Sequence, residues 1–381
     1  MARPRRSLHR IRLLVLLVSI GMQVPALVWL SLQLPRALAL VPFVVAALVT
    51  TPYLFVQLHQ PFSDGPKPGW LRYLVLWPFL GWWSTSSLFA IAGAFVYAVA
   101  CLAHLNATGP LGITLGFSAL AGLWSVKRTP RLVELDVELP DLPPAFEGYR
   151  VAQISDVHLG SYTPKARVDD WVARLTATRA DLVAITGDLV TSGDAFLDDI
   201  AASLGNLEAP DGVFACMGNH DYFCDAERLV AGLRDGGIQV LRNEGVHVER
   251  DGQRLYVAGI EDRWTRRNDL GKTLAGRRPG QATLLLAHDP DHFPEAAAAG
   301  VSLQLSGHTH GGQMALPVGN GRYNLARLMT RFTNGLFSDG RSRLYVSRGA
   351  GTTGPPVRLF APAELTVLTL RAPRIAPRRD E

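Results

Sequence analysis

The pattern of hydrophobic and polar positions divides the chain into two parts. In the first part, three long stretches lack charged residues, namely 13–35, 37–63 and 73–126. A helix needs about 20 apolar residues to cross a bilayer, and Gly109-Pro110 interrupts the third stretch. We therefore predict an all-α transmembrane region of about four helices, near 13–34, 38–58, 84–105 and 109–126. Residues 70–83, which contain Pro78 and two adjacent tryptophans, are predicted to lie along the membrane interface.

Beyond residue 130, the pattern changes to short apolar runs separated by polar loops. Arg131–Glu138 alternates apolar and polar residues, which is the period of a strand. Further strands are predicted at Tyr149–Ile154, Asp181–Thr186, Gly212–Met217, Val246–Arg250, Arg254–Ile260, Thr283–Ala287, Val301–Leu305, Arg343–Ser347 and Glu364–Leu370. Helices are predicted over about 164–178, 195–207 and 225–235, and residues 311–342 show no strong element. This order predicts an α/β fold with a central pair of sheets flanked by helices.

The two patterns together define the domain organisation. Residues 1–130 form the multi-span transmembrane region, and residues 131–148 hold the first strand and a proline-containing linker. The α/β domain is expected over residues 149–372, followed by a basic tail at residues 373–381.

Charge separates the same two parts. Up to Arg131 there are eleven Lys/Arg and one acid, Asp64, whereas the remainder has 27 Lys/Arg against 32 Asp/Glu. The basic N-terminus should stay in the cytoplasm, and four spans would return the chain there. We expect an integral protein of the bacterial inner (plasma) membrane with its α/β domain in the cytoplasm. A crossing by residues 70–83 would place that domain outside, and a cleaved signal peptide is the alternative for the first span.

The same composition bears on partners and on redox chemistry. The net negative charge of the α/β part disfavours a nucleic-acid partner, and with it a nuclease. Three cysteines, Cys101, Cys216 and Cys224, give no disulfide framework, although a Cys216–Cys224 bridge is conceivable. The oligomeric state is not predicted from the sequence.

Five clusters of metal-type side chains follow the apolar runs, so each should lie at the end of a strand. Their candidate ligands are Asp156, His158, Asp188, Asn219, His288, His308 and His310. Asp156 and His158 are two residues apart and share one side of an extended strand end. A carboxylate such as Asp188 can bridge two cations. The set of Asp, Asn and His suits two divalent ions of Mn, Fe or Zn better than Mg or Ca.

Paired divalent ions indicate phosphate ester chemistry. Two ions about 3.5–4 Å apart can activate a shared water and hold the oxygens of a phosphoryl group. A proton must still reach the leaving oxygen, and His220 is a candidate for this step. Asp221 directly follows it and is the candidate for orienting that imidazole or keeping it charged. A single histidine is more often structural than catalytic, but six of the seven histidines after residue 150 fall within or beside these clusters.

These motifs resemble the calcineurin-like metallophosphoesterase superfamily over about residues 149–370. The matching blocks are DVH at 156–158, GDLV at 187–190, GNHD at 218–221, AHDP at 287–290 and GHTHGGQ at 307–313. The last block and VSRGAG at 346–351 are similar to the YkuE-like branch. Multi-span members of that branch are called transmembrane proteins with a metallophosphoesterase domain.

The resemblance implies a four-layer α/β/β/α sandwich. It implies Asp156, His158 and His310 on one ion, Asn219, His288 and His308 on the other, and Asp188 bridging both. It also implies that His220 acts as a transition-state stabiliser or proton donor. The activity expected is that of a membrane-anchored, metal-dependent phosphoric ester hydrolase.

The expected substrate follows from the branch. Some relatives cleave the pyrophosphate of UDP-2,3-diacylglucosamine in lipid A synthesis, so a lipid-linked nucleotide is one hypothesis. Residues 311–342 would then be a lid, in which Arg322, Arg327 and Arg331 either pair with phosphate or are solvated surface residues. A general phosphodiesterase or phosphatase is the alternative activity. A non-catalytic, metal-binding membrane scaffold is the alternative of another class.

Overall fold

A computed structural model describes residues 16–59, 64–125, 129–318, 321–354 and 357–373. The chain divides into two units. The first consists of Met1–Pro61 with Lys67–Lys127, and the second of Phe62–Pro66 with Arg128–Glu381. The basic N-terminal segment and all but the first residue of the predicted basic tail lie outside the described residues.

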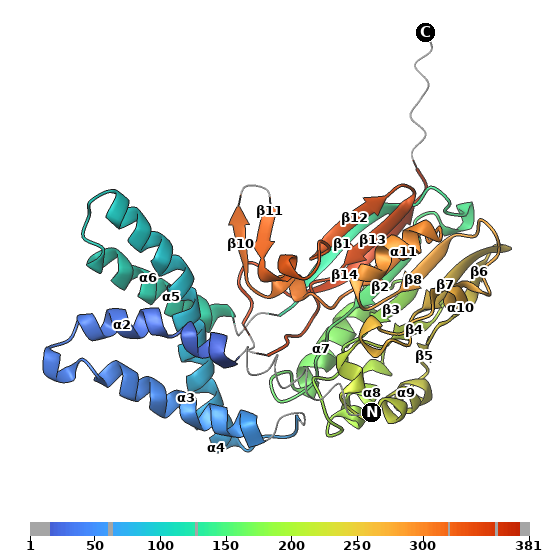
Figure 1. The fold of residues 1–381 in the computed structure, drawn as a ribbon. Coiled ribbons are helices and arrows are strands. Elements are labelled where there is room, and N and C mark those ends of the chain that lie inside the picture. The colour runs from blue at the N-terminus through green and yellow to red at the C-terminus, as the bar shows by residue number, and fades with distance from the viewer. Residues whose placement is uncertain (1–15, 60–63, 126–128, 319–320, 355–356, 374–381) are drawn as a thin grey trace, which may run out of the picture. The chain divides into compact units, whose positions relative to one another are not determined.

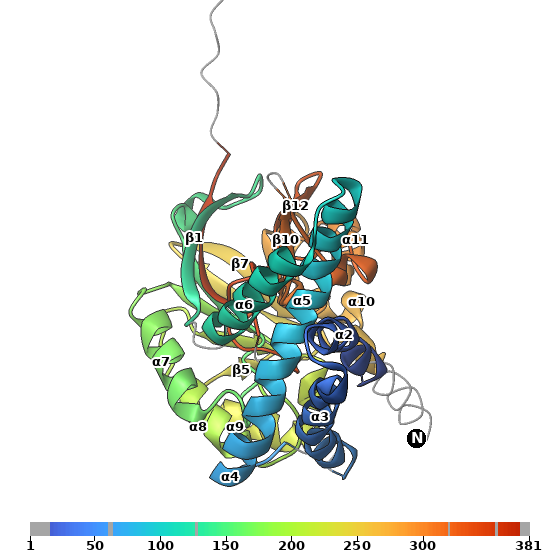
Figure 2. The ribbon, with the colours of Figure 1, turned by 90° about the vertical axis from the view of Figure 1, so that its left-hand side faces the viewer.

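The first unit is helical (Figures 1 and 2). Its elements are α2 (Val24–Leu32), η1 (Arg36–Leu38), α3 (Val41–His59), α4 (Gly69–Leu71), η2 (Arg72–Leu76), α5 (Trp77–Leu102) and α6 (Thr108–Ser125). Within the described part, Arg36–Val56 and Gly69–Leu102 are long and apolar enough to cross a membrane, and Leu16–Leu32 is a shorter apolar helix.

The third predicted span begins earlier than the sequence pattern indicated. Residues 70–83 are not a separate element, because α4, η2 and α5 form one continuous helix from Gly69 to Leu102. Pro78 lacks a backbone N–H, and it lies two residues after the end of the π-helical turn η2. A π turn shifts the hydrogen-bond spacing locally, so the helix continues past the proline.

A buried polar contact joins three elements of the helical unit. The side-chain oxygen of Gln23, next to α2, accepts hydrogen bonds from Thr50 on α3 at 3.2 Å and from Trp82 on α5 at 2.7 Å. Such hydrogen bonds hold apolar helices in one register, since the helices have few other directional contacts. Large apolar side chains elsewhere in this unit are exposed, among them Leu48, Phe95 and Phe117.

The second unit contains two six-stranded sheets. The first has the order β1-β14-β2-β3-β4-β5, with β1 (Arg131–Glu138), β14 (Glu364–Arg371), β2 (Arg150–Ile154), β3 (Leu182–Thr186), β4 (Val213–Cys216) and β5 (Gln239–Val240). The second has the order β12-β13-β9-β8-β7-β6, with β12 (Gly335–Asp339), β13 (Ser342–Val346), β9 (Leu303–Ser306), β8 (Thr283–Leu286), β7 (Gln253–Gly259) and β6 (Glu244–Arg250).

Apolar residues on both faces of these sheets build four layers. Side chains such as Val151 and Phe214 from the first sheet pack against Leu284 and Leu303 from the second. The outer face of the first sheet is covered by α7 (Lys165–Thr176), α8 (Leu197–Leu204) and α9 (Ala226–Asp235), which lie together in Figures 1 and 2. The outer face of the second sheet packs on α10 (Leu270–Leu274) and α11 (Phe293–Ala298). The predicted α/β/β/α sandwich is thereby confirmed.

The segment 311–342 contains strands that the sequence pattern did not indicate. A hairpin of β10 (Ala315–Val318) and β11 (Gly321–Asn324) stands apart from the two sheets, and β12 lies at the edge of the second sheet (Figure 1). None of these short strands has an alternating apolar pattern, since β10 contains Pro317, β11 reads GRYN and β12 begins with Gly335. Their strand form depends on pairing with a neighbour, which a local pattern does not encode.

A short piece of chain between α3 and α4 belongs to the α/β unit. The Asp64 carboxylate accepts hydrogen bonds from the backbone N–H of Ser161 at 2.8 Å and from its hydroxyl at 2.5 Å. The N–H of Asp64 donates to the carbonyl of Ser192 at 3.2 Å. Residues 64–66 are therefore fastened to the loops that follow β2 and β3.

Candidate metal centre

Five strands deliver the candidate ligands to one edge of the paired sheets. Asp156 and His158 follow β2, Asp188 follows β3, and Asn219 follows β4. His288 follows β8, and the pair His308 and His310 follows β9. These strands run parallel within each sheet, in the pairs β2–β3, β3–β4 and β8–β9. Their carboxyl ends therefore meet at one place.

The ligand loops have unusual backbone conformations. Positive φ angles occur at five of the candidate ligands, namely Asp156 (52°), His158 (46°), Asp188 (55°), His308 (70°) and His310 (52°). Gly187 also has a positive φ of 80°, and a Cβ there would lie 2.5 Å from the backbone nitrogen of Gly218. Left-handed conformations at non-glycine residues cost about 1–3 kcal/mol each and persist where surrounding contacts impose them. They are concentrated here at the site.

The first ligand group comprises Asp156, His158, Asp188 and His310, all buried. The Nε2 atoms of His158 and His310 are 3.1 Å apart. His310 Nε2 lies 3.3 Å from Asp156 Oδ1, and His158 Nε2 lies 3.5 Å from Asp188 Oδ2. Four donor atoms thus converge on one point, at spacings suited to a common cation.

The second ligand group comprises Asp188, His288 and His308. His288 Nε2 is 3.1 Å from Asp188 Oδ2 and 3.2 Å from His308 Nδ1. Asn219 lines the same cavity, and its buried Oδ1 has no hydrogen-bond partner among the described residues. A buried amide oxygen without a partner is unfavourable unless a cation binds it. The residues present therefore fit two divalent ions, with Asp188 common to both groups.

The protonation of the imidazoles suits this role. Burial lowers the pKa of His158 to about 3 and also lowers the pKa values of His308 and His310. These rings are neutral near pH 7, which is the form that binds metals. Burial alone would lower the pKa of His288, but the charge of Asp188 raises it well above its usual value. A proton on His288 must leave when a cation binds there.

Asp221 holds the ligand loops together. Its buried carboxylate accepts hydrogen bonds from the backbone N–H groups of Asp188 at 3.0 Å, Leu189 at 2.8 Å and Gly218 at 2.8 Å. The sequence-based hypothesis gave it the task of orienting the His220 ring. In the structure that contact belongs to Thr191, whose carbonyl oxygen lies 2.7 Å from His220 Nδ1. The geometry therefore gives Asp221 a positioning role between the loops after β3 and β4.

Replacing Asp221 with asparagine is expected to destabilise the α/β unit. Hydrogen bonds to a charged group contribute about 1.5–3 kcal/mol each, and the amide nitrogen would face backbone donors. Burial and the charge of Asp188 raise the pKa of Asp221 to about 7. Above that pH, where the carboxyl is ionised, we expect the free energy of unfolding to fall by about 2–4 kcal/mol, since one buried charged partner is lost. Chemical denaturation of Asp221→Asn beside the exposed variant Asp225→Asn would measure the difference. Equal stability of Asp221→Asn and the wild type would contradict this role.

His220 is half-buried and lines the cavity beside the candidate ligands. Its backbone N–H donates to Asp188 Oδ1 at 2.8 Å, which fixes it beside the bridging carboxylate. Its ring packs edge-on against His158, with centroids 4.7 Å apart, and against Phe223, with centroids 5.1 Å apart. Because Nδ1 donates to the Thr191 carbonyl, Nε2 remains for proton transfer.

The cavity over these ligands has a volume of about 340 Å³. Three of the residues that line this cavity come from the predicted lid, residues 311–342, namely Ala326, Met329 and Thr330. Met329 is 83% exposed, so an apolar side chain is presented to solvent at the rim. The Thr330 hydroxyl donates to Asp291 at 2.5 Å, which ties this segment to the loop after β8.

The arginines of the predicted lid have other neighbours. Arg327 stacks over the Tyr323 ring at 4.7 Å, and Arg331 stacks over the Phe332 ring at 4.6 Å. Neither belongs to the cavity lining, and the side chain of Arg322 lies outside the described residues. Arg327 and Arg331 therefore each lie against an aromatic ring, outside the lining of the cavity over the candidate ligands.

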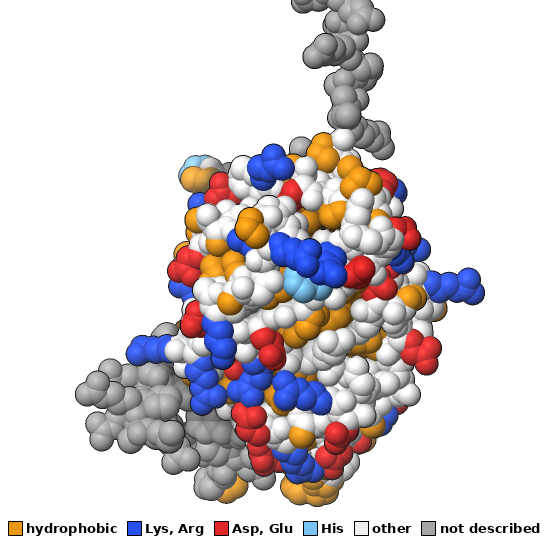
Figure 3. Space-filling model, turned by 90° about the vertical axis from the view of Figure 1, so that its right-hand side faces the viewer, with side chains coloured by type: hydrophobic (Ala, Val, Ile, Leu, Met, Phe, Trp, Pro, Cys, Tyr) orange, Lys and Arg blue, Asp and Glu red, His pale blue; other side chains and the backbone are white. Residues whose placement is uncertain are grey.

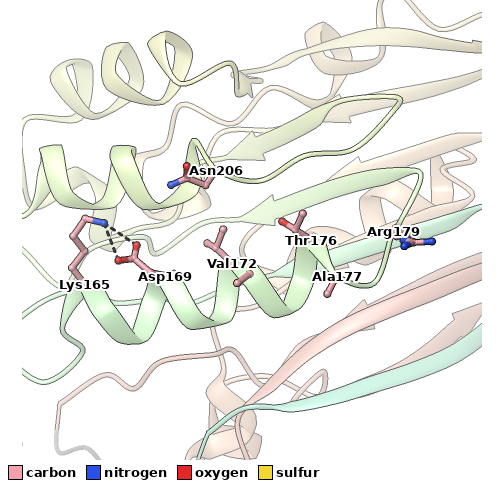
Figure 4. A pocket seen from close by; sticks show the side chains of 8 residues that line it. Lys165, Asp169, Val172, Thr176, Ala177, Arg179 and Asn206 are labelled. Carbon is pink, nitrogen blue, oxygen red and sulfur yellow. Dashed lines mark hydrogen bonds and ion pairs between the residues drawn. The ribbon is translucent and has the colours of Figure 1, made fainter.

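A second cavity, of about 590 Å³, lies on α7 (Figure 4). Its polar lining includes Arg179, Asn206 and the ion pair of Lys165 with Asp169 at 2.8 Å. None of the metal-type residues named above lines it. The candidate metal ligands therefore meet at the smaller cavity over the strand ends, not at this one.

Comparison with known proteins identifies the fold family. A family model for calcineurin-like phosphoesterases matches residues 149–312. The uncharacterized metallophosphoesterase YkuE of Bacillus subtilis is 32% identical over 235 residues, covering 61% of this chain and 82% of that protein. The chain belongs to the calcineurin-like phosphoesterase family. Family membership and a metal-dependent phosphoesterase domain, both predicted from the motifs, are confirmed.

Further relatives of this phosphoesterase include proteins with membrane regions in their names. The bovine transmembrane protein with metallophosphoesterase domain is 32% identical over 271 residues, covering 67% of this chain but 60% of that longer protein. Among solved structures, a dimetal phosphatase from Danio rerio shares 14% identity and a TM-score of 0.38, covering 59% of this chain and 93% of that one.

Several residues of this phosphoesterase site were not anticipated from the sequence. Thr191 holds His220, and the carbonyl of Thr186 lies 2.7 Å from His288 Nδ1. Both contacts use backbone oxygens, which leave no signature in residue type. Arg358 contacts His310 Nδ1 at 3.2 Å, and the sequence does contain a feature that sets this residue apart. It is a lone charged residue in the apolar run Val357–Phe360.

Proposed function

We propose that the chain hydrolyses phosphate ester or pyrophosphate bonds at a dinuclear metal centre. The observation that carries this proposal is Asp188, whose carboxylate belongs to both ligand groups. Asp156, His158 and His310 would hold one ion, and Asn219, His288 and His308 would hold the other. Mn, Fe and Zn are the ions that best suit this mixed oxygen and nitrogen set.

The side chains divide the remaining work of the reaction. Two bound divalent ions would supply activation of water and neutralise charge on the phosphoryl group. Water oxygen forms a bond to phosphorus while the bond from phosphorus to the leaving oxygen breaks. His220, protonated on Nε2, gives its proton to the leaving oxygen, and Thr191 keeps the ring oriented through Nδ1. Asp221 keeps the loops of Asp188 and Asn219 in register.

The test is metal-dependent turnover by the purified full-length chain. Bis-(p-nitrophenyl) phosphate should be hydrolysed when Mn²⁺ is supplied, and removal of the metal by a chelator should abolish turnover, because the charged phosphoryl group then lacks its electrostatic partner. Re-addition of Mn²⁺, Fe²⁺ or Zn²⁺ one at a time identifies the ion that restores the rate. Equal rates with and without metal would overturn the proposal.

We further propose a lipid-linked nucleotide, such as UDP-2,3-diacylglucosamine, as the substrate class. The exposed Met329 at the cavity rim supports an apolar group beside the reacting phosphate. The face in Figure 3 carries basic and acidic side chains together. Elsewhere in the α/β unit such side chains also pair, for example Arg242 with Glu227. Such a surface offers no continuous basic stripe for nucleic acid. In the turnover assay, a soluble phosphodiester preferred over the acylated nucleotide would favour a general phosphodiesterase.

We also propose that the helical unit anchors the protein in the bacterial inner membrane with the site in the cytoplasm. The apolar helices Arg36–Val56 and Gly69–Leu102 support the anchor. Asp64 supports the topology, because Asp64 and Gly65 accept hydrogen bonds from Ser161 of the α/β unit. Asp64 and the rest of the α/β unit must therefore lie on the same side of any membrane. The helices between Asp64 and Arg128 then cross that membrane an even number of times.

A C-terminal alkaline-phosphatase fusion is expected to be inactive in cells, because that reporter requires an oxidising compartment. A fusion to residue 65, in the connection between α3 and α4, should be inactive as well. Strong activity from either fusion would contradict the cytoplasmic site, and opposite results from the two would contradict the even number of crossings.

A further inference from the structure

Arg358 is a buried cation beside the metal centre. The residue is 6% exposed, and within the described residues its hydrogen bonds reach no carboxylate. They reach instead the backbone oxygens of Gly351, His310, Ala361, Arg348 and Gly349. A guanidinium offers five N–H donors in a rigid plane. Converging carbonyl dipoles therefore compensate a charge that would otherwise be costly to bury.

Three of these oxygens belong to the loop 348–351, which braces Asp156. The N–H of Ala350 donates to Ser155 at 2.9 Å, and the N–H of Gly351 donates to the carbonyl of Asp156 at 2.8 Å. Gly349 has φ 73°, and a Cβ there would lie 2.6 Å from the Cβ of Asp156. The loop thus lies in direct contact with the first ligand, which itself has a left-handed backbone.

The same guanidinium contacts a second ligand from behind. One terminal nitrogen of Arg358 is 3.1 Å from the carbonyl of His310, and the other is 3.2 Å from its Nδ1. The opposite ring nitrogen, Nε2, faces His158 and Asp156. One side chain therefore fixes the orientation of the His310 ring and, through the loop, the place of Asp156.

We propose that Arg358 is a positioning residue of the metal centre, which sets His310 and Asp156 for the ion that they share with His158. The inference rests on the metal centre proposed above. Groups that orient metal ligands from behind typically change metal affinity about 10–100-fold when removed. The effect should concentrate on the ion of the first ligand group, because His288 and His308 have no contact with Arg358 among the described residues.

The test compares Arg358→Lys and Arg358→Met with the wild-type full-length chain in detergent. Lysine keeps the charge but lacks the planar fork, so both variants should bind the first Mn²⁺ about 10–100-fold more weakly. Titration with Mn²⁺ against a chelating indicator gives the two affinities, and metal analysis after dialysis should show one retained ion in place of two. Thermal unfolding of the metal-free proteins, measured alongside, reports any loss of stability.

Arg250→Lys is the matched control. Arg250 pairs with Asp181 at 2.7 Å and stacks over Tyr149, away from every candidate ligand. The Arg250→Lys substitution should lower the unfolding temperature without changing the Mn²⁺ affinities.

If the Arg358→Met variant does not fold, the Arg358→Lys variant decides. Wild-type affinities in the folded Arg358 variants would overturn the proposal, even if their unfolding temperature falls. Metal binding is measured without turnover, so a chain that binds two ions but hydrolyses nothing would refute the proposed function alone.

Discussion

Replacing Asp188 with asparagine is expected to weaken both metal sites at once and to reduce turnover by about 100–1000-fold, the usual cost of removing one preorganised electrostatic group. Asp188 is the residue common to both ligand groups. Burial alone would raise the pKa of its carboxyl, but the charges of His288 and His220 hold that pKa well below its usual value. The Asp188 carboxylate is therefore negatively charged before any cation binds, and asparagine removes that charge.

The fold should survive this substitution. Asparagine has nearly the same shape, and its side-chain oxygen can still accept the hydrogen bond from the backbone N–H of His220. Metal analysis and turnover are measured together, with Asp235→Asn on the exposed end of α9 as the matched control. A variant that retains two ions at wild-type affinity would show that Asp188 does not bridge them.

Replacing His220 with asparagine is expected to reduce kcat by about 10²–10⁴-fold, the usual contribution of a general acid, while the metal content is unchanged. Asparagine can still donate to the Thr191 carbonyl, so the loop is retained. The loss should be larger for an alkyl phosphodiester than for a p-nitrophenyl ester. A poor leaving group needs the proton, whereas p-nitrophenolate leaves without it.

The matched control is His247→Asn, on an exposed histidine of β6 that lies against Tyr256. An equal loss for both leaving groups would assign His220 to transition-state stabilisation in place of proton donation. An unchanged kcat for both would remove His220 from the catalytic residues.

Several parts of the structure could be predicted because their signals are local. Apolar runs followed by Asp-x-His, Gly-Asp, Asn-His and His-x-His predict strands with ligands at their ends. Parallel strands bring those ends to one edge, so the ligands meet even though Asp156 and His308 are 152 residues apart. The alternating or wholly apolar pattern of each strand also indicates whether one face or both are buried.

The roles of Asp221 and Arg358 could not be predicted in the same way. Asp221 is next to His220 in the sequence, which favoured a direct contact between their side chains. The 3-10 turn η4 (His220–Tyr222) instead directs the Asp221 carboxylate to the amides of the β3 loop, 31 to 33 residues away. Arg358 acts on His310 from 48 positions further along the chain. Each contact depends on how loops pack in the folded protein. Neither is marked by a periodic pattern or a fixed residue spacing in the sequence.

The candidate ligand types of this phosphoesterase, their order and their place at strand ends could be read from the sequence, because short-range patterns dictate strands and strand ends dictate ligand positions. How those candidate ligands are held became clear only from the folded protein. The Asp221 carboxylate, the Thr191 carbonyl and the Arg358 guanidinium fix the loops through backbone groups. The folded structure also assigns residues 64–66 to the α/β unit. Backbone groups are the same at every position, so a sequence cannot show which of them will meet.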